Sequence, residues 1–510
     1  MRGPAARRVR WSGDAIVRTA VVAALMTAVP ACTGDASPSP VADAAAEPTS
    51  PPAATSPPAP RTSPPEQGAS SAPRGDPAGR PNVILVVTDD QSAASMRGAP
   101  VAMPWLRARL EEPGWTTFAN AVVTTPLCCP SRATILTGAL AAHTGVLTNG
   151  DGAALDETET AATWLHDAGY RTALVGKYLN GYPWEGRPLV PVGWDRWFAK
   201  LNVSDGSLYT GYDVIDDGTR RSFGAAASDY ATDLLMRQAA SFVAETPARR
   251  PFFLYVAPSA PHPPAEPAAR HASLLARPVT APGARTLAAM NDVTDGPAWL
   301  RSLPRIDVAT ATSLEEARLR ERATLRAVDD GLRSLWAAVA ARGDLDRTVW
   351  FLVSDNGYSF GDRRWIGKIC PWETCIHVPF VAHVPWTRGG VSDALVGNVD
   401  IAPTIADLAG TDTSWSDGVS LTDLLEGGRS PARRSLPISW VGDDRVPAWQ
   451  GIRFPQAVLI RHDDGTTELY DLAADPAQRR NLADDPAASR LRNRAERALA
   501  RSLARVGTGG

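Results

Sequence analysis

Four short apolar runs, separated by segments with helical periodicity, most strongly limit how this chain can fold. The runs cover residues 83–87, 172–175, 252–256 and 349–353. Because consecutive positions are apolar, both faces of each run must be buried, which is typical of central strands in a parallel sheet that helices cover on both sides. The pattern predicts an α/β fold in which a mostly parallel central sheet is sandwiched by helices.

End signals mark one of the helices and a change of pattern near the C-terminus. Ser313 and Glu316 form a capping box, Gly343 provides a stop, and the residues between them keep one apolar face. Later segments predict two antiparallel strands at 457–460 and 466–470 and a final helix at 488–506. We therefore predict a main domain over residues 80–410 and a smaller α+β domain over residues 411–510.

The first 79 residues have the composition of an export signal followed by a tether. Residues 1–32 combine a basic start, an apolar stretch at 20–29 and the small pair Ala31-Cys32. The apolar stretch is shorter than the roughly 20 residues that a membrane span needs. Residues 29–32, VPAC, resemble a bacterial lipobox, which predicts a lipid anchor at Cys32; a plain secretory signal is the alternative. Residues 33–79 contain 12 prolines, and Val41 is the only large aliphatic residue, which predicts a disordered tether.

Polar side chains follow each of the four apolar runs. Each polar segment alone is explained by a helix cap or a solvated loop. However, the carboxyl ends of parallel strands meet at one edge of a sheet, where ligands bind, so we expect these segments to converge. In chain order they are Thr88-Asp89-Asp90, Gly176-Lys177, Ala260-Pro261-His262 and Ser354-Asp355-Asn356.

The candidate ligands after the first and fourth runs offer only oxygen atoms. Asp89, Asp90, Asp355 and Asn356 suit a hard cation such as calcium or magnesium better than zinc, which prefers histidine and cysteine. Three clustered carboxylates without a cation would repel one another and raise their pKa values. A divalent metal is therefore predicted at this edge.

The overall charge excludes a general nucleic-acid-binding protein but permits a local positive pocket. Lysine and arginine number 52 against 55 aspartate and glutamate, for a formal net charge of -3, whereas nucleic-acid binders normally carry a basic excess. Lys177 and Lys368 supply positive charge for an anionic substrate. Together with the metal ligands, they predict a site for an anionic ester.

The most specific motif lies at residues 126–138, PLCCPSRATILTG. Cys128-Cys129-Pro130-Ser131-Arg132 matches the CxPSR element of the type I sulfatase family, and residues 136–138, LTG, complete that signature. Residues 169–178, GYRTALVGKY, and residues 468–472, ELYDL, match further family elements. On these motifs the chain resembles the type I sulfatases, and it is most similar in motif form to the N-acetylglucosamine-6-sulfatase branch. The resemblance implies an alkaline-phosphatase-like fold.

The resemblance also implies a modified nucleophile and a metal. A formylglycine-generating enzyme would oxidise Cys128 to formylglycine, and calcium, or alternatively magnesium or manganese, would be bound. Pro130 fits the first turn of a helix, which leaves residue 128 at the positive end of the helix dipole. The metal ligands implied by the resemblance are Asp89, Asp90, residue 128, Asp355 and Asn356.

Further roles follow from the same resemblance. The hydrated formylglycine would attack the sulfur of a sulfate monoester, and its second hydroxyl would later expel the sulfate. Lys177 and Lys368 would clamp the sulfuryl group, and Arg132 would support the hydrate. His262 would donate a proton to the departing alcohol.

One position departs from the family pattern. Many members have histidine two residues after the first lysine, where it helps to break down the sulfated intermediate, but this chain has Leu179 followed by Asn180. Either Asn180 or another residue contacts substrate in its place, or proton removal is arranged differently. His143 is an alternative substitute.

Two remaining cysteines lie just after Lys368. Cys370 and Cys375 form a local disulfide or remain two free thiols, and the export signal favours the disulfide. Trp372 and His377 either line the substrate entrance or pack in the interior.

Three functions remain open from the sequence. The first is hydrolysis of sulfate monoesters of a sugar or an aryl compound. The second is hydrolysis of phosphate diesters or phosphonate esters, because related formylglycine enzymes share the signature. The third is an unmodified surface lipoprotein that binds sulfated glycans without catalysis.

Overall fold

A computed structural model describes residues 79–201, 207–413, 415–428 and 433–506. The predicted export signal and nearly all of the predicted tether lie outside the described residues, so both stay predictions. Within the described part of the chain, no helix combines the length and the apolar character needed to cross a membrane.

A large mixed sheet forms the centre of the protein. Its five middle strands, β8, β1, β7, β3 and β4, are all parallel, which confirms the predicted parallel centre. Strands β11 and β5 pair antiparallel with the two ends of this parallel block. Among the described residues the sheet has ten strands, in the order β12 (Gly390–Gly397), β2 (Trp115–Val122), β11 (Phe380–His383), β8 (Thr348–Ser354), β1 (Asn82–Thr88), β7 (Phe252–Ala257), β3 (Arg171–Lys177), β4 (Arg196–Lys200), β5 (Tyr212–Asp216) and β6 (Thr219–Phe223).

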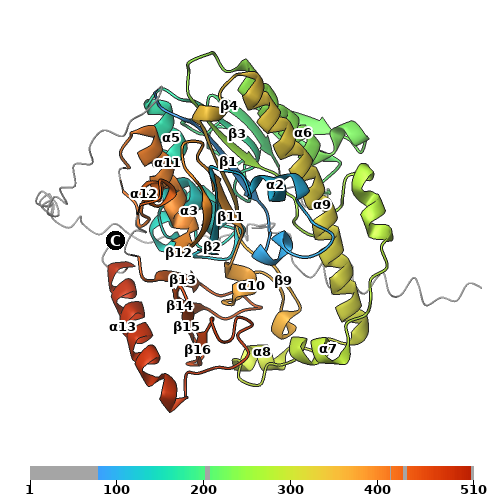
Figure 1. Ribbon diagram of the computed structural model, residues 1–510, viewed down its shortest axis with the longest axis vertical. Coiled ribbons are helices and arrows are strands. Elements are labelled where there is room, and N and C mark those ends of the chain that lie inside the picture. Colours follow the sequence, from blue (N-terminus) through green and yellow to red (C-terminus); the bar gives the residue numbers. More distant parts are fainter. Residues whose placement is uncertain (1–78, 202–206, 414, 429–432, 507–510) are drawn as a thin grey trace, which may run out of the picture. The chain divides into compact units, whose positions relative to one another are not determined.

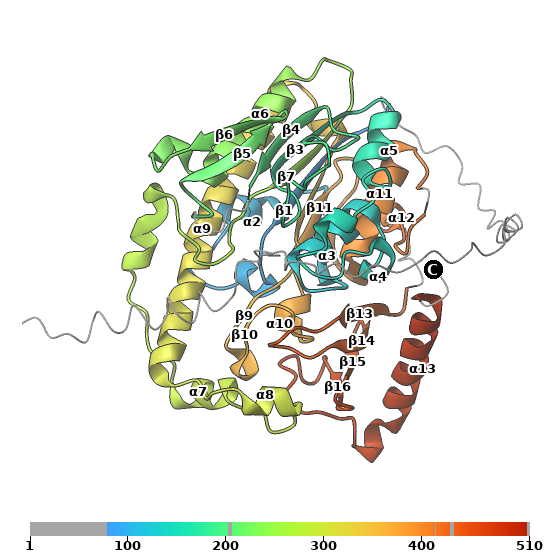
Figure 2. The same ribbon diagram turned by 180° about the vertical axis from the view of Figure 1, so that it is seen from behind.

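Helices cover both faces of this sheet (Figures 1 and 2). Along β1, Val83, Leu85 and Val87 face one apolar core while Ile84 and Val86 face the other, because successive side chains of a strand point to opposite faces. The predicted helix sandwich is thereby confirmed. The first core is covered by α3 (Cys128–Thr137), α5 (Ala161–Asp167), α11 (Ile401–Ala409) and α12 (Thr422–Leu425), and the second by α2 (Pro104–Arg109), α6 (Ala231–Glu245) and α9 (Val308–Ala341).

Helix α9 begins earlier than the sequence predicted. The Asp307 carboxylate accepts a hydrogen bond from the Thr310 backbone N–H (2.7 Å) and caps the first turn. Ser313 and Glu316 therefore lie inside the helix, and the predicted capping box is wrong. The predicted stop is close to correct, because the helix ends at Ala341 and Gly343 takes a positive φ of 72°.

A smaller antiparallel sheet follows the large one in the chain. It consists of β13 (Leu436–Trp440), β14 (Trp449–Phe454), β15 (Ala457–His462) and β16 (Thr467–Asp471), and α13 (Ser489–Val506) packs on it. The two predicted strands and the terminal helix are confirmed, whereas β13 and β14 were missed. The division at residue 410 stays a prediction, and Leu421 and Leu425 belong to the core of the large sheet.

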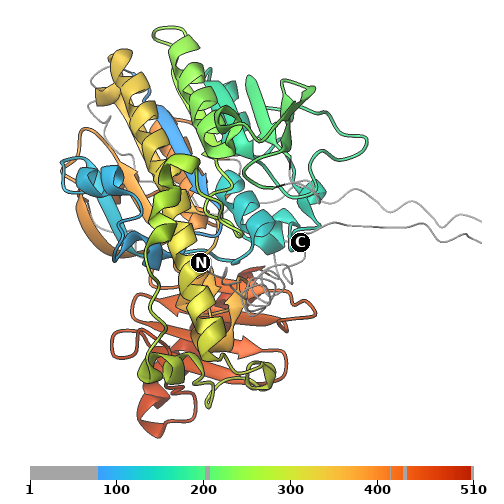
Figure 3. The ribbon, with the colours of Figure 1, turned by 90° about the vertical axis from the view of Figure 1, so that its right-hand side faces the viewer.

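The face of the small sheet opposite α13 packs against the segment that carries Lys368. Val458, Ile460 and Tyr470 share an apolar cluster with Ile369 and Trp372. Figure 3 shows α9, in yellow, running from the large sheet to the small one. Two short helices, α7 (Ala284–Met290) and α8 (Ala298–Ser302), precede α9 in the chain and lie at the end of the protein where the small sheet is (Figure 1).

Candidate active site

The polar segments after β1 and β8 lie side by side at the carboxyl edge of the sheet. Thr88 and Ser354 are register partners at the ends of these parallel strands, so the residues that follow them must meet. The Asp90 backbone N–H donates to Asp355 Oδ1 (3.1 Å), and Asn356 Nδ2 donates to Asp90 Oδ1 (2.7 Å). The predicted convergence of these oxygen ligands is therefore present.

Cys128 meets this cluster from the first residue of α3. Leu127 keeps an extended backbone, so the helix begins at Cys128 and places this residue at the positive end of the helix dipole. Cys128 Sγ lies 3.6 Å from Asp89 Oδ1 and accepts a hydrogen bond from Lys368 Nζ (2.9 Å). The side chain is almost completely buried.

Two lysines bind neighbouring carboxylates of this cluster. Lys177, the last residue of β3, donates from Nζ to Asp89 Oδ2 (2.7 Å). Lys368 follows β10 (Ile366–Gly367) and donates to Asp90 Oδ1 (2.8 Å). Lys368 therefore contacts Cys128 directly, and Lys177 binds Asp89, the carboxylate beside Cys128 Sγ.

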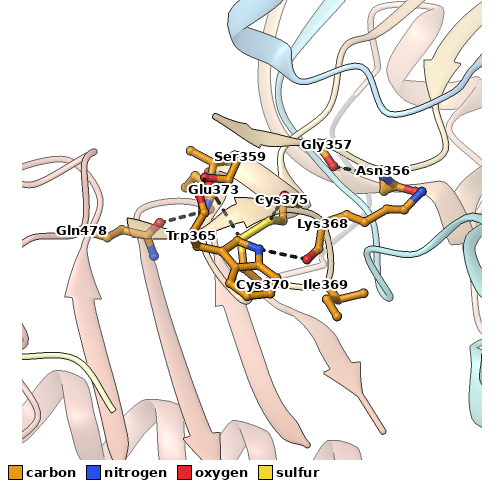
Figure 4. The surroundings of a disulfide bond; sticks show 12 residues. Asn356, Gly357, Ser359, Trp365, Lys368, Ile369, Cys370, Glu373, Cys375 and Gln478 are labelled. Carbon is orange, nitrogen blue, oxygen red and sulfur yellow. Dashed lines mark hydrogen bonds between the residues drawn. A yellow bond between two sulfur atoms is a disulfide. The ribbon is translucent and has the colours of Figure 1, made fainter. Parts of the chain in front are cut away.

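A disulfide anchors the loop that carries Lys368. Cys370 and Cys375 are bonded, which confirms the predicted disulfide and excludes two free thiols there. The Gly357 backbone N–H donates to the Cys375 carbonyl (2.8 Å), so this loop is tied to the segment that follows Asn356. In Figure 4 the side chain of Lys368 points away from the disulfide and toward Asn356.

Arg132 lies one helical turn after Cys128, on the same face of α3. Its Nε donates to Asp355 Oδ2 (2.8 Å), and its Nη1 donates to the Lys177 carbonyl (3.0 Å). The guanidinium is fully buried. Arg132 therefore joins the helix to both β8 and β3 and orients the Asp355 carboxylate.

His262 is more exposed to solvent than the carboxylate it faces: 22% of its side chain is exposed, against 1% for Asp90. Its Nδ1 lies 2.6 Å from the Pro263 carbonyl, and a carbonyl only accepts, so Nδ1 carries a proton. Its Nε2 lies 3.4 Å from Asp90 Oδ2. A second proton on Nε2 would make the imidazolium, which is the form that a proton donor requires.

Burial and neighbouring charges act against each other in this cluster. Burial alone would raise the pKa of Asp89, but Lys177 and the other cations hold it well below its usual range. Burial, together with the negative charge of Asp89, raises the pKa of Asp355. Burial also raises the pKa of the Cys128 thiol despite both lysines, so the thiol stays protonated and is a poor nucleophile.

The donor atoms fit a divalent metal. Asp90 Oδ2 and Asn356 Oδ1 are buried and accept no hydrogen bond from any residue that the structure describes. One ligand atom from each of Asp89, Cys128 and Asp355 lies within 4.8 Å of the others, about twice the distance from calcium to a ligand oxygen. Free oxygen acceptors in a buried acidic cluster are the arrangement that a hard cation satisfies.

Asn180 contacts Cys129, whereas His143 lies near the opposite end of α3. The Asn180 backbone N–H donates to Cys129 Sγ (2.9 Å), one residue beyond Cys128. His143 Nδ1 pairs with Asp417 (2.8 Å), whose backbone binds Gly138 at the opposite end of α3. A ten-residue helix spans about 15 Å, so His143 is remote from the nucleophile and the prediction that it substitutes for the missing histidine is wrong.

The two residues predicted either to line the entrance or to pack have different surroundings. Trp372 is buried, stacks on Trp299 and donates from its indole to Glu468, so it packs in the interior. His377 is half-buried and its Nδ1 lies 3.6 Å from Glu373.

The sequence analysis missed Lys200. It ends β4 and is the register partner of Lys177 on the neighbouring strand β3. The signal was present in the composition, because the chain contains only three lysines: Lys177, Lys200 and Lys368.

The comparison with family models agrees with this geometry. The model described as Sulfatase matches residues 81–411. The chain belongs to the sulfatase family. A second model, described as N-sulphoglucosamine sulphohydrolase, C-terminal, matches residues 361–505 of this sulfatase and includes its small sheet.

Individual relatives match the same region. The human N-acetylglucosamine-6-sulfatase is 32% identical over 386 residues, which cover 72% of this chain and 68% of that protein. The extracellular sulfatase SULF-1 homolog of Drosophila melanogaster is 31% identical over 381 residues; the match covers 71% of this chain but only 33% of the fly protein.

A solved structure shares the fold. The structure of BT4656 in complex with its substrate D-glucosamine-2-N,6-O-disulfate has a TM-score of 0.72 and 25% identity, and it covers 84% of this chain and 98% of that chain. The predicted alkaline-phosphatase-like fold, with its smaller C-terminal sheet, is thereby confirmed.

Proposed function

We propose that this chain hydrolyses sulfate monoesters and that its substrate is a sulfated amino sugar. The observation that carries the proposal is the position of Cys128, which lies at a helix N-terminus between Lys368 and Asp89. The sulfatase relatives and the solved complex with a sulfated glucosamine support this substrate class.

Each cluster residue has a role in this proposal. Lys177 and Lys368 bind the sulfuryl oxygens, because Lys368 contacts residue 128 and Lys177 contacts Asp89 beside it. Arg132 holds Asp355 and the end of β3 in place. His262 donates a proton to the departing alcohol from the open side of the cluster.

Two groups complete the chemistry. Asp89, Asp90, Asp355 and Asn356 would hold a divalent metal, with calcium proposed, that stabilises negative charge on the sulfuryl oxygens. Formylglycine at residue 128, made by a formylglycine-generating enzyme, would supply a hydroxyl nucleophile. The raised pKa of the Cys128 thiol supports this modification, because an unmodified thiol would react poorly.

We further propose that the protein is exported and anchored by lipid at Cys32, with plain secretion as the alternative. The disulfide at Cys370–Cys375 is typical of an oxidising compartment. A relative named as an extracellular sulfatase supports export.

The test is release of sulfate by protein expressed with a formylglycine-generating enzyme. N-acetylglucosamine 6-sulfate, an aryl sulfate and an aryl phosphodiester are compared, with and without EDTA. We expect metal-dependent release from the sulfates, and mass analysis should find an aldehyde at residue 128. A higher rate on the phosphodiester would favour the phosphate or phosphonate ester alternative, and an intact, inactive thiol would favour the glycan-binding lipoprotein.

A pair of variants isolates the nucleophile. Cys128→Ser should block the release of sulfate, whereas Cys129→Ser is the matched control because the Cys129 Sγ accepts a hydrogen bond from the Asn180 backbone N–H. Multiple turnover by Cys128→Ser would contradict the proposed function.

A further inference from the structure

The third lysine of the chain lies beside the proposed site but takes no part in the proposed reaction. Of 52 basic residues, all except Lys177, Lys200 and Lys368 are arginine. Arginine is a planar fork and lysine a compact point charge, so they are not interchangeable in a buried site. Two of these three lysines contact the acidic cluster, which raises the question of what Lys200 binds.

Lys200 is placed like the two site lysines. It ends a parallel strand at the same edge of the sheet, and it is paired in register with Lys177, so its side chain is directed to the same face, about 4.8 Å along the sheet. Its exposed fraction is 3%, against 3% for Lys177 and 6% for Lys368. Its burial therefore matches that of residues that border the site.

Unlike the other two lysines, Lys200 has no acidic partner among the described residues. Its Nζ lies 5.2 Å from the centroid of the Tyr212 ring. Burial and the positive charge of Lys177 lower its pKa to about 7, although Asp89 opposes the shift. A buried ammonium without a counter-charge is strongly unfavourable, and an anionic ligand would remove this penalty.

The charges and the strand order place Lys200 relative to the proposed reaction. Arg132, Lys177 and Lys368 pair with the carboxylates of Asp355, Asp89 and Asp90, so the positive charge of Lys200 is additional to these pairs. His262, the proposed donor to the leaving alcohol, follows β7, and β3 lies between β7 and β4, the strand that ends at Lys200. An anionic group on the part of the alcohol that lies over β3 and β4 would therefore be within reach of Lys200.

We propose that Lys200 is a specificity-determining residue that binds a second anionic group, a sulfate or a carboxylate, on the alcohol part of the sulfate ester. The inference rests on the proposed sulfatase function and deepens it. The substrate class is then a sulfate ester whose alcohol carries its own negative charge, such as a disulfated sugar.

Two sugars that differ in one anionic group test the proposal. N-sulfoglucosamine 6-sulfate carries a second sulfate, and N-acetylglucosamine 6-sulfate does not. Release of the 6-sulfate is measured for the wild type and for Lys200→Met, both matured to formylglycine. We expect Lys200→Met to lower kcat/KM on the disulfated sugar about 10- to 100-fold, the value of one hydrogen bond to a charged group, mainly through KM, and to leave the monosulfated sugar unchanged.

The melting temperature of Lys200→Met distinguishes a substrate-binding role for Lys200 from a structural role. If Lys200 only binds substrate, Lys200→Met should melt at the same or a higher temperature, because it removes a buried charge that has no acidic partner in the described part of the chain. A clear fall in Tm, with equal losses on both sugars, would show a structural lysine and overturn the proposal. Lys200→Gln repeats the measurement if the methionine variant does not fold.

Two other results would each contradict a different proposal. An unchanged kcat/KM on the disulfated sugar would overturn the role of Lys200 alone, since the wild type would still be an active sulfatase. No release of 6-sulfate from either sugar by the modified wild type would count against the proposed function itself.

Discussion

The buried ion pair between Arg132 and Asp355 should dominate the stability of the metal-free protein. Both side chains are fully buried and 2.8 Å apart. Arg132→Met leaves the Asp355 charge without its cation, which costs about 3–5 kcal/mol for a buried pair. It also removes the donor to the Lys177 carbonyl, worth about 1 kcal/mol.

A double-mutant cycle measures the pair itself. Asp355→Asn removes the carboxylate charge, so in the double variant neither buried charge is left alone. We expect the double variant to be more stable than the sum of the single losses predicts, by about 2–3 kcal/mol. Urea unfolding in EDTA, followed by tryptophan fluorescence, gives the free energies.

The effect of calcium on the stability of the variants gives a second test of this ion pair. A divalent ion bound to Asp355 would replace part of the positive charge lost with Arg132, so calcium should reduce the cost of Arg132→Met. Arg453→Met is the matched control. Arg453 is also buried, but its Nε pairs with Glu373 Oε1 at 2.9 Å and not with a carboxylate of the proposed metal site. Additive single losses, or equal calcium effects on Arg132→Met and Arg453→Met, would refute this account.

Three further predictions follow. His262→Ala should lower kcat about 10²–10⁴-fold on an ester with a poor leaving group, and near-normal turnover there would refute its role as the proton donor. The Cys370→Ser, Cys375→Ser variant should lose about 2 kcal/mol of stability and some turnover, because this loop positions Lys368; unchanged urea midpoint and kcat would contradict this. His383 is buried between Trp115 and Trp336, and burial lowers its pKa to about 4. The unfolded chain therefore binds a proton that the folded protein does not between pH 6.5 and 4, so stability should fall across this window as pH drops; His383→Phe should show a smaller fall in urea unfolding, and an identical profile would exclude the effect.

The sequence was most informative where local patterns decide structure. A run that is apolar on consecutive positions, such as 349–353, predicts a strand buried on both faces, and β8 is such a strand. Short or partly exposed strands gave weaker signals. β6 is mostly exposed. β13 pairs with β14 and β14 pairs with β15, and side chains of β13 and β14 share an apolar cluster with Ile369, so both strands depend on distant partners.

The sequence by itself determined four of the five strands of the parallel centre (β1, β3, β7 and β8 but not β4), the oxygen ligands that follow β1 and β8, and the motif at Cys128. Only the tertiary structure decided which of these groups meet. Asp90 binds the side chain of Asp355, 265 positions away, because strand order puts β1 beside β8. The tertiary structure also decided that Lys200 is buried beside Lys177 without an acidic partner among the described residues. Local periodicity sets the conformation of a segment, whereas distance between side chains depends on which strands become neighbours, and no local pattern encodes that order.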